Sequence, residues 1–210
     1  MEKYQQNLDT EEIDNSDDIE FTIKSYPFIF SNNYDKYKYH ENGNKIILPK
    51  YILYEISKYK NISFPITLVC NNIYIGVLEF EEFIESAYIS KYLYNVLKLD
   101  LNNEDIVSLK IIKDNLNQAT SIKIKPKNEE FYTIPDKKKY LEIHLKKQFT
   151  CLMENTTISV PFKDYTIQFD IIKCLPNNVV MITDVDDLEV EIEPMIEKKD
   201  NKNNNSEINS

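Results

Sequence analysis

The chain has 210 residues, a formal net charge of −10 at pH 7 and a hydrophobic content of 42%. All basic residues are lysines, and the acidic excess disfavours a nucleic-acid binder, which needs a basic surface to displace counterions. It also disfavours an anionic membrane surface, and no apolar run approaches the length of a bilayer span. Residues 1–20 lack the basic and apolar regions of a signal peptide, so we expect a cytoplasmic or nuclear protein.

The two ends of the chain differ in composition from the rest. Residues 1–19 are acidic and polar, and residues 194–210 are of low complexity, rich in asparagine and charge. We expect both to be disordered, because neither has the apolar content for a packed core. The part between them divides at the polar stretch 114–117, which predicts one subdomain over 20–113 and another over 114–193.

The clearest pattern lies between residues 43 and 80. Residues 45–48 are apolar and β-branched and predict a strand, after which Pro49 begins a helix, because the first helical position needs no N–H donor. Residues 64–70 and 73–80 predict two more strands. The asparagines at 71–72 predict a two-residue turn between them, since asparagine tolerates positive φ.

The same order of elements recurs later in the chain. The sequence LPKYIL at 48–53 aligns with ISKYLY at 89–94, and Ser90 takes the place of Pro49 as a predicted N-cap. A further predicted strand at 106–112 follows this second helix. Two copies suit a small barrel closed by a pseudo-twofold axis; chance similarity in a chain rich in isoleucine, tyrosine and lysine is the alternative.

The region before the repeat is less regular. Residues 21–30 are apolar but contain a proline, which predicts two short strand pieces. Residues 32–44 have the composition of a loop. The three tyrosines of this loop, Tyr34, Tyr37 and Tyr39, are interpreted either as a contact surface or as part of a flexible segment.

The second half has a different order. Residues 120–125 alternate between apolar and polar and predict a half-exposed strand, residues 131–134 predict a short extended piece, and residues 137–149 predict a helix. One helix against four or five strands is typical of an α+β roll. The remaining strands are predicted at 156–160, 165–174, 179–183 and 188–192.

Two predictions concern burial. Ile47 and Val69 lie in runs that we interpret as central barrel strands, so both are expected in the core. Lys137 begins the predicted helix of the second half and is expected at an exposed helix end. Truncation of either apolar side chain should therefore destabilise the fold, whereas truncation of Lys137 should not.

No arrangement of residues points to catalysis. Cys70, Cys151 and Cys174 are isolated in apolar runs, which supports neither a zinc site nor a disulfide framework. His40 lies in a polar loop, and His144 lies on the apolar stripe of its predicted helix. The chain also lacks a phosphate-binding loop and the common hydrolase motifs. We therefore expect no enzymatic activity, no cofactor and no metal.

An acidic run near the end contains Asp186, Asp187 and Glu189. Val185 and Leu188 interrupt it and no glycine occupies the turn position of an EF-hand loop, which disfavours a calcium site. A solvated strand edge is one interpretation, and a surface for a protein partner is the other.

Two motifs together carry a resemblance to a known family. One begins GNKI and leads into the Pro-led helix, and the other is GVLEF. The chain resembles the N-terminal domain of the ubiquitin fusion degradation protein 1 family over roughly residues 21–194, although Asn44 stands where the family usually has a second glycine. The matching motif residues are Gly43, Lys45, Ile46, Pro49, Pro65, Gly76, Val77, Leu78, Glu79 and Phe80.

The resemblance implies a mainly β fold, a double-psi β-barrel followed by a smaller α+β roll. It implies a non-catalytic adaptor that binds ubiquitin and polyubiquitin chains. Together with a partner adaptor subunit, it would present ubiquitinated proteins to a hexameric AAA-type ATPase, including at the ER surface in ER-associated degradation. Alternatives are a role in plastid-type protein import and a substrate-binding scaffold without ubiquitin specificity. Candidate ubiquitin-binding residues are Asp186, Asp187 and Glu189.

Overall fold

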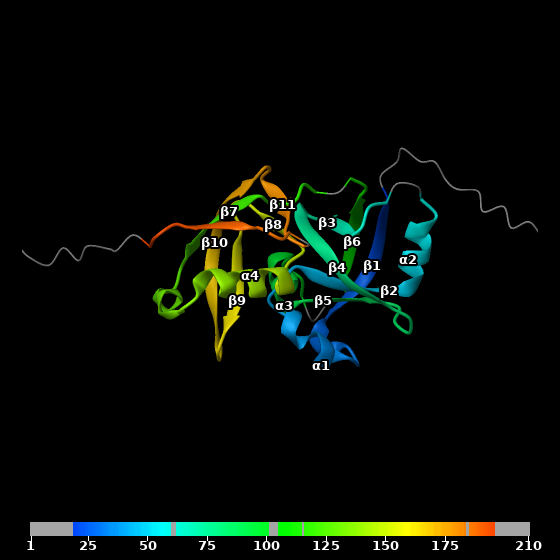
Figure 1. The fold of residues 1–210 in the computed structure, drawn as a ribbon. Helices are drawn as coiled ribbons and strands as arrows, with labels where there is room; N and C mark the ends of the chain where they lie inside the picture. Colours follow the sequence, from blue (N-terminus) through cyan, green and yellow to red (C-terminus); the bar gives the residue numbers. More distant parts are fainter. Residues whose placement is uncertain (1–18, 60–61, 101–104, 115, 184, 196–210) are drawn as a thin grey trace, which may run out of the picture.

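The structure is a computed structural model with two β-rich bodies side by side, the first formed by the earlier half of the chain and the second by the later half (Figure 1). The expected disordered ends, 1–19 and 194–210, lie almost wholly outside the described part of the chain. The described residues are 19–59, 62–100, 105–114, 116–183 and 185–195.

The first body is a closed barrel of six strands in the order β1-β5-β2-β4-β3-β6. The pairs β1–β5 and β2–β4 are parallel and the other pairs are antiparallel. This mixed barrel confirms the predicted double-psi architecture. Its strands are β1 (Glu20–Pro27), β2 (Lys45–Pro49), β3 (Thr67–Cys70), β4 (Ile73–Glu81), β5 (Ala87–Ile89) and β6 (Ile106–Ile112).

The barrel has an internal twofold pattern. Exchanging β1 with β4, β2 with β5 and β3 with β6 reproduces every strand pair, so the sequence repeat is structural rather than accidental. The helices α2 (Lys50–Ser57) and α3 (Lys91–Val96) occupy equivalent places. Ser90 is the N-cap of α3 as predicted, and its Oγ accepts from the Leu93 amide at 3.1 Å. Pro49 precedes α2 rather than starting it, because its ψ of 143° is extended.

The predicted turn is present, and β4 is irregular near Gly76. Asn71 and Asn72 join β3 to β4 with φ of 48° and 63°, which confirms a two-residue turn of the kind that asparagine favours. In the pairing of β2 with β4, Ile46 faces Val77 whereas Ile47 faces Glu79, so β4 carries an extra residue there. The strand predicted at 64–70 is shorter than expected and starts at Thr67.

The segment after β1 is helical, where strand and loop were expected. It forms the 3-10 helices η1 (Phe28–Phe30) and η2 (Lys38–His40) around the short helix α1 (Tyr34–Tyr37). Phe28, Tyr37 and Ile47 form a small buried cluster outside the main barrel core. Tyr37 is only 1% exposed, so the interpretation of three tyrosines as one contact surface is wrong.

The second body is the predicted α+β roll. A four-stranded sheet has the order β12-β7-β10-β9, and a separate pair joins β11 to β8. The piece expected to be extended at 131–134 falls in a 3-10 helix, and β8 was not predicted. No helix of the described residues is long and apolar enough to cross a bilayer. The elements are β7 (Ser121–Pro126), η3 (Glu129–Thr133), α4 (Lys137–Gln148), β8 (Cys151–Met153), β9 (Thr157–Phe162), β10 (Tyr165–Leu175), β11 (Val179–Met181) and β12 (Glu189–Ile192).

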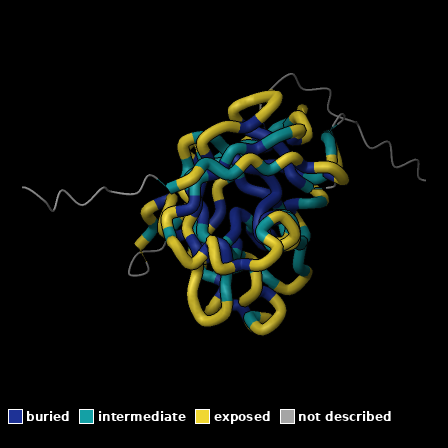
Figure 2. The backbone as a smooth tube through the Cα atoms, turned by 60° about the vertical axis from the view of Figure 1, so that its left-hand side comes forward, coloured by how far each residue is buried: buried dark blue, intermediate teal, exposed yellow. Residues whose placement is uncertain are grey.

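Each body has its own apolar core. Figure 2 shows the buried residues in the interior of the molecule and the exposed ones around it. Leu68 is fully buried in the barrel, but the neighbouring Val69 is only half-buried, so its prediction as a core residue is wrong. Tyr92 of α3 packs against both cores and meets the Phe149 ring edge-on at 5.7 Å. The two bodies therefore share an apolar contact as well as the polar one described below.

Candidate functional site

Three exposed acidic residues, Asp186, Asp187 and Glu189, lie where the chain enters β12; we call them the acidic edge. Val185 and Leu188 alternate with them and are buried in the roll core, which anchors the segment and keeps the carboxylates at the surface. β12 is the outermost strand of its sheet and pairs only with β7 among the described strands.

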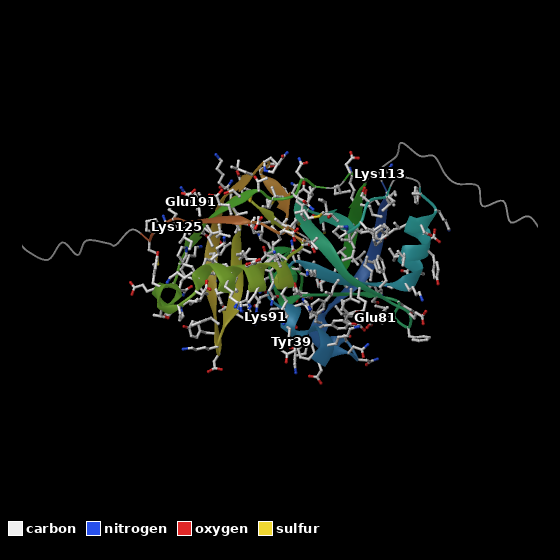
Figure 3. All side chains as sticks on the ribbon, in the orientation of Figure 1. Tyr39, Glu81, Lys91, Lys113, Lys125 and Glu191 are labelled. Atoms are coloured by element: carbon white, nitrogen blue, oxygen red, sulfur yellow. The ribbon has the colours of Figure 1, made fainter. Side chains whose placement is uncertain are left out.

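The next two glutamates along the chain, Glu191 of β12 and Glu193 just after it, are neutralised by lysines. Lys123 Nζ lies 2.8 Å from Glu191 Oε1, and Lys125 Nζ lies 3.0 Å from Glu193 Oε1, at the end of the roll shown in Figure 3. The hydrogen bond to Glu191 raises the pKa of Lys123. Within the part of the chain that the structure describes, the acidic edge forms no ion pair. Its charge is therefore available to a basic partner.

The family motif lies elsewhere, and three of its residues, Gly43, Lys45 and Gly76, lie at the contact between barrel and roll. The chain has two glycines, and both are there. A Cβ at Gly43 would lie 1.8 Å from the carbonyl oxygen of Gln148, and one at Gly76 would lie 1.9 Å from Thr150 Oγ1. Neither φ is positive, so the close approach of the two bodies is what requires glycine. We call this contact, between 39–45 and 74–76 of the barrel and 147–151 of the roll, the joint.

Asn44, the departure from the family pattern, is the centre of the joint. Its side-chain Nδ2 donates to the carbonyl oxygens of Tyr74 at 3.1 Å and Cys151 at 2.9 Å. Its Oδ1 accepts from the Thr150 amide at 2.9 Å, and its own carbonyl accepts from the Gly76 amide at 2.9 Å. Asn44 is 5% exposed, so one buried amide satisfies backbone groups of both bodies.

Two basic side chains of the barrel reach the carboxyl end of α4. Lys45 Nζ donates to the Lys147 carbonyl at 3.0 Å, and His40 Nδ1 lies 3.1 Å from the same oxygen. Burial lowers the pKa of Lys45, and burial together with the charge of Lys45 lowers that of His40. The backbone carbonyls in the last turn of a helix have no intrahelical partner, so a cationic or N–H donor at this place supplies the missing hydrogen bond.

The remaining motif residues build the barrel wall. Ile46 and Pro49 are buried, and Glu79 Oε2 lies 3.3 Å from the Tyr37 hydroxyl oxygen. Five of the ten motif residues are buried or lie at the joint and the other five are half-buried, so none of them is fully exposed. The half-buried motif residues are Pro65, Val77, Leu78, Glu79 and Phe80.

The side chains that could carry chemistry are dispersed. Cys70, Cys151 and Cys174 are buried and free, and burial raises the pKa of both Cys151 and Cys174 to about 12. A thiol with so high a pKa remains protonated and is a poor nucleophile at neutral pH. His144 packs against the Tyr140 ring at 4.7 Å. The described residues contain no group of three or more His, Cys, Asp or Glu placed to hold a metal ion.

Comparisons with known proteins agree with this architecture. A family model described as "Ubiquitin fusion degradation protein UFD1, N-terminal subdomain 2" matches residues 118–195, which are the roll. A "Ubiquitin fusion degradation protein 1 homolog" of Caenorhabditis elegans is 31% identical over 150 residues, 69% of this chain and 42% of the relative.

Two further relatives come from other lineages. The "Ubiquitin recognition factor in ER-associated degradation protein 1" of Homo sapiens is 27% identical over 152 residues, 70% of this chain and 48% of the relative. The "Ubiquitin fusion degradation protein 1" of Schizosaccharomyces pombe is 26% identical over 176 residues, 80% of this chain and 49% of the relative. The chain thus spans about half the length of the relatives it matches. The fold, the two motifs and these matches together show that the chain belongs to the ubiquitin fusion degradation protein 1 family.

Proposed function

We propose that this chain is a non-catalytic adaptor that binds ubiquitin and polyubiquitin chains. It acts in ubiquitin-dependent degradation, including the ER-associated pathway, from the cytoplasm or nucleus and at the ER surface. Two relatives support this reading through their names, which describe ubiquitin fusion degradation and ubiquitin recognition in ER-associated degradation. By the same family membership, it presents ubiquitinated proteins to a hexameric AAA-type unfoldase together with a partner adaptor.

The acidic edge is our candidate for the ubiquitin-binding surface. Ubiquitin's recognition face is an apolar patch ringed by basic side chains, so an exposed acidic surface suits it. Asp186, Asp187 and Glu189 form no ion pair within the described residues, whereas Glu191 on the same strand is paired with a lysine. The net charge of −10 adds long-range attraction, which mainly raises the association rate.

A titration of labelled mono-ubiquitin and tetra-ubiquitin onto the whole chain tests the proposal. We expect weak binding of mono-ubiquitin and tighter binding of the chain through two weak sites, one on each subdomain, because a tethered second ubiquitin binds at a high effective concentration. Raising the salt concentration should weaken both. If neither ligand binds at about 1 mM protein, or if both bind equally well, the adaptor function is wrong.

A matched pair of variants tests the site. Replacing the acidic edge by amides (Asp186→Asn, Asp187→Asn, Glu189→Gln) should weaken ubiquitin binding about tenfold through lost attraction. The control removes the same number of exposed carboxylates elsewhere on the roll (Glu129→Gln, Glu130→Gln, Asp164→Asn). Equal weakening by both variants would show that only the overall charge matters and that the acidic edge is not the site.

A further inference from the structure

A second surface, on the barrel, is hollowed and lined by acidic and apolar side chains. It is a groove of about 560 Å³ bounded by Ser31, Asn33, Lys50 and the end of β4 with the residues that follow it. We call it the barrel groove. Glu81 belongs to the barrel and lies across the view from Glu191 of the roll (Figure 3), and the acidic edge also belongs to the roll. The groove is therefore separate from the candidate ubiquitin site.

Apolar side chains line the groove, and one of them is open to solvent. Phe83 is 97% exposed, whereas Phe80, Ile84 and Tyr88 are half-buried. Single exposed apolar residues are common on protein surfaces, but an exposed phenylalanine among other apolar residues of one groove is typical of a site that a partner covers.

The carboxylates of the groove differ in their partners. Glu79 forms an ion pair with Lys36, and Glu82 forms one with Lys50. Glu81 instead accepts two hydrogen bonds on Oε1, from the Tyr37 hydroxyl and from Asn33 Nδ2. Both donors are neutral, and in the described part of the chain Glu81 has no cation at ion-pair distance and no donor to Oε2.

The floor beneath Glu81 is rigid. Tyr37 is buried, and its ring lies 5.9 Å from that of Phe28, beside Ile47 in the small third cluster. Burial and then the hydrogen bond to Glu81 raise the pKa of Tyr37, so its hydroxyl remains a donor over the physiological range. A carboxylate held in this way needs little reordering when a cation arrives, which lowers the cost of binding.

We propose that the barrel groove binds an extended segment of a partner protein in which a lysine or arginine stands next to a large apolar residue. The cation pairs with the free oxygen of Glu81, and the apolar side chain covers Phe83. Charge complementarity selects this occupant, because lysines neutralise Glu79 and Glu82 and leave Glu81 without a cation among the described residues, in a chain with a net charge of −10. A charge-assisted hydrogen bond to a preoriented carboxylate gives both affinity and register.

Anisotropy titration of fluorescein-labelled short peptides onto the whole chain tests this. The probes carry Arg-Phe, Lys-Leu, Glu-Phe or Arg-Ser in an otherwise Gly/Ser sequence. We expect the first two to bind at up to about 1 mM protein and the last two to bind at least about tenfold more weakly. If the first two do not bind, or if Glu-Phe binds as well as Arg-Phe, the proposal is overturned.

Variants locate the binding on the surface. Glu81→Gln and Phe83→Ser should each weaken Arg-Phe peptide binding about tenfold, whereas the exposed controls Glu55→Gln and Ile106→Ser should not. Thermal melts check that all four variants fold. Mono-ubiquitin binding, measured on the same proteins, should not change with Glu81→Gln. If that variant weakens ubiquitin and leaves the peptide unaffected, the groove belongs to the ubiquitin site and the present proposal is wrong.

Discussion

The joint and the acidic edge are built in opposite ways. At the joint, two backbones approach so closely that Gly43 and Gly76 have no room for a Cβ, and the Asn44 amide satisfies buried groups on both sides. At the acidic edge, side chains stand in solvent with no ion pair within the described residues. The family motif thus supplies both glycines of the joint and part of the barrel, whereas the candidate binding residues lie outside the motif. Substitutions should therefore separate into those that change stability and those that change binding.

Gly43→Ala should have the largest effect on stability. The new Cβ would lie 1.8 Å from the Gln148 carbonyl oxygen and 2.9 Å from the Gln148 Cα, so backbone must move. We expect a loss of about 3 kcal/mol or more in the free energy of unfolding, measured by urea titration. A loss within about 0.5 kcal/mol would show that the two bodies can separate slightly at no cost, and that the joint is loose.

Ile47→Ala should cost about 2–4 kcal/mol, because its side chain is fully buried. Val69→Ala is the matched comparison, since both positions are β-branched and in barrel strands. Val69 is half-buried and should lose about 1 kcal/mol or less in the same urea melts. Equal losses would mean that the outer face of β3 is covered as thoroughly as the cluster around Ile47.

These two positions show how far the sequence could be interpreted. Apolar runs, the repeat and the turn residues predicted the strands of the barrel, because each is a local signal. These signals could not show which side chains of a short strand point into the barrel interior, since residues 67–70 are apolar or β-branched on both faces. The helical segment at 28–40 was missed because the burial of Phe28 and Tyr37 against Ile47 depends on contacts between distant residues.

The candidate sites were predictable to different degrees. The acidic edge was found from composition, with Val185 and Leu188 as the signal of a strand edge. The joint was not, although a sequence signal existed: a chain with two glycines places both where another backbone is close. Glu81 could not have been found, because its neutral partners Tyr37 and Asn33 lie more than forty positions away in the chain.

Asn44→Ala should cost about 2–3 kcal/mol, because the Thr150 amide and the Cys151 carbonyl lose their partner inside the joint. Asn95→Ala, on the exposed face of α3, is the control and should be neutral or slightly stabilising through helix propensity. Urea melts of both variants compare them. If both leave stability unchanged, water replaces the amide and Asn44 is not the centre of the joint.

The free energy of unfolding should also depend on pH, because His40 is part of the joint. Burial and Lys45 lower the pKa of His40 below its ordinary value of 6.5, so the unfolded chain takes up this proton more readily than the folded one. Stability is therefore fully present above pH 6.5 and declines as the pH falls below it. His144, whose pKa burial also lowers, adds to the decline. His40→Gln should flatten the profile in urea melts between pH 5 and 7 relative to the parent chain, and an unchanged profile would assign the whole effect to other groups.

Neutralising the acidic edge should change stability least of all. Asp186→Asn, Asp187→Asn and Glu189→Gln remove three carboxylates that form no ion pair within the described residues, so the free energy of unfolding should stay within about 0.5 kcal/mol of the parent. Removing like charges from a chain with a net charge of −10 should, if anything, stabilise it slightly at low salt. Urea melts at two salt concentrations measure this. A loss as large as that of Asn44→Ala would mean that these carboxylates hold β12 in place, and any weakening of ubiquitin binding by the same variant would then report a damaged fold rather than a lost contact.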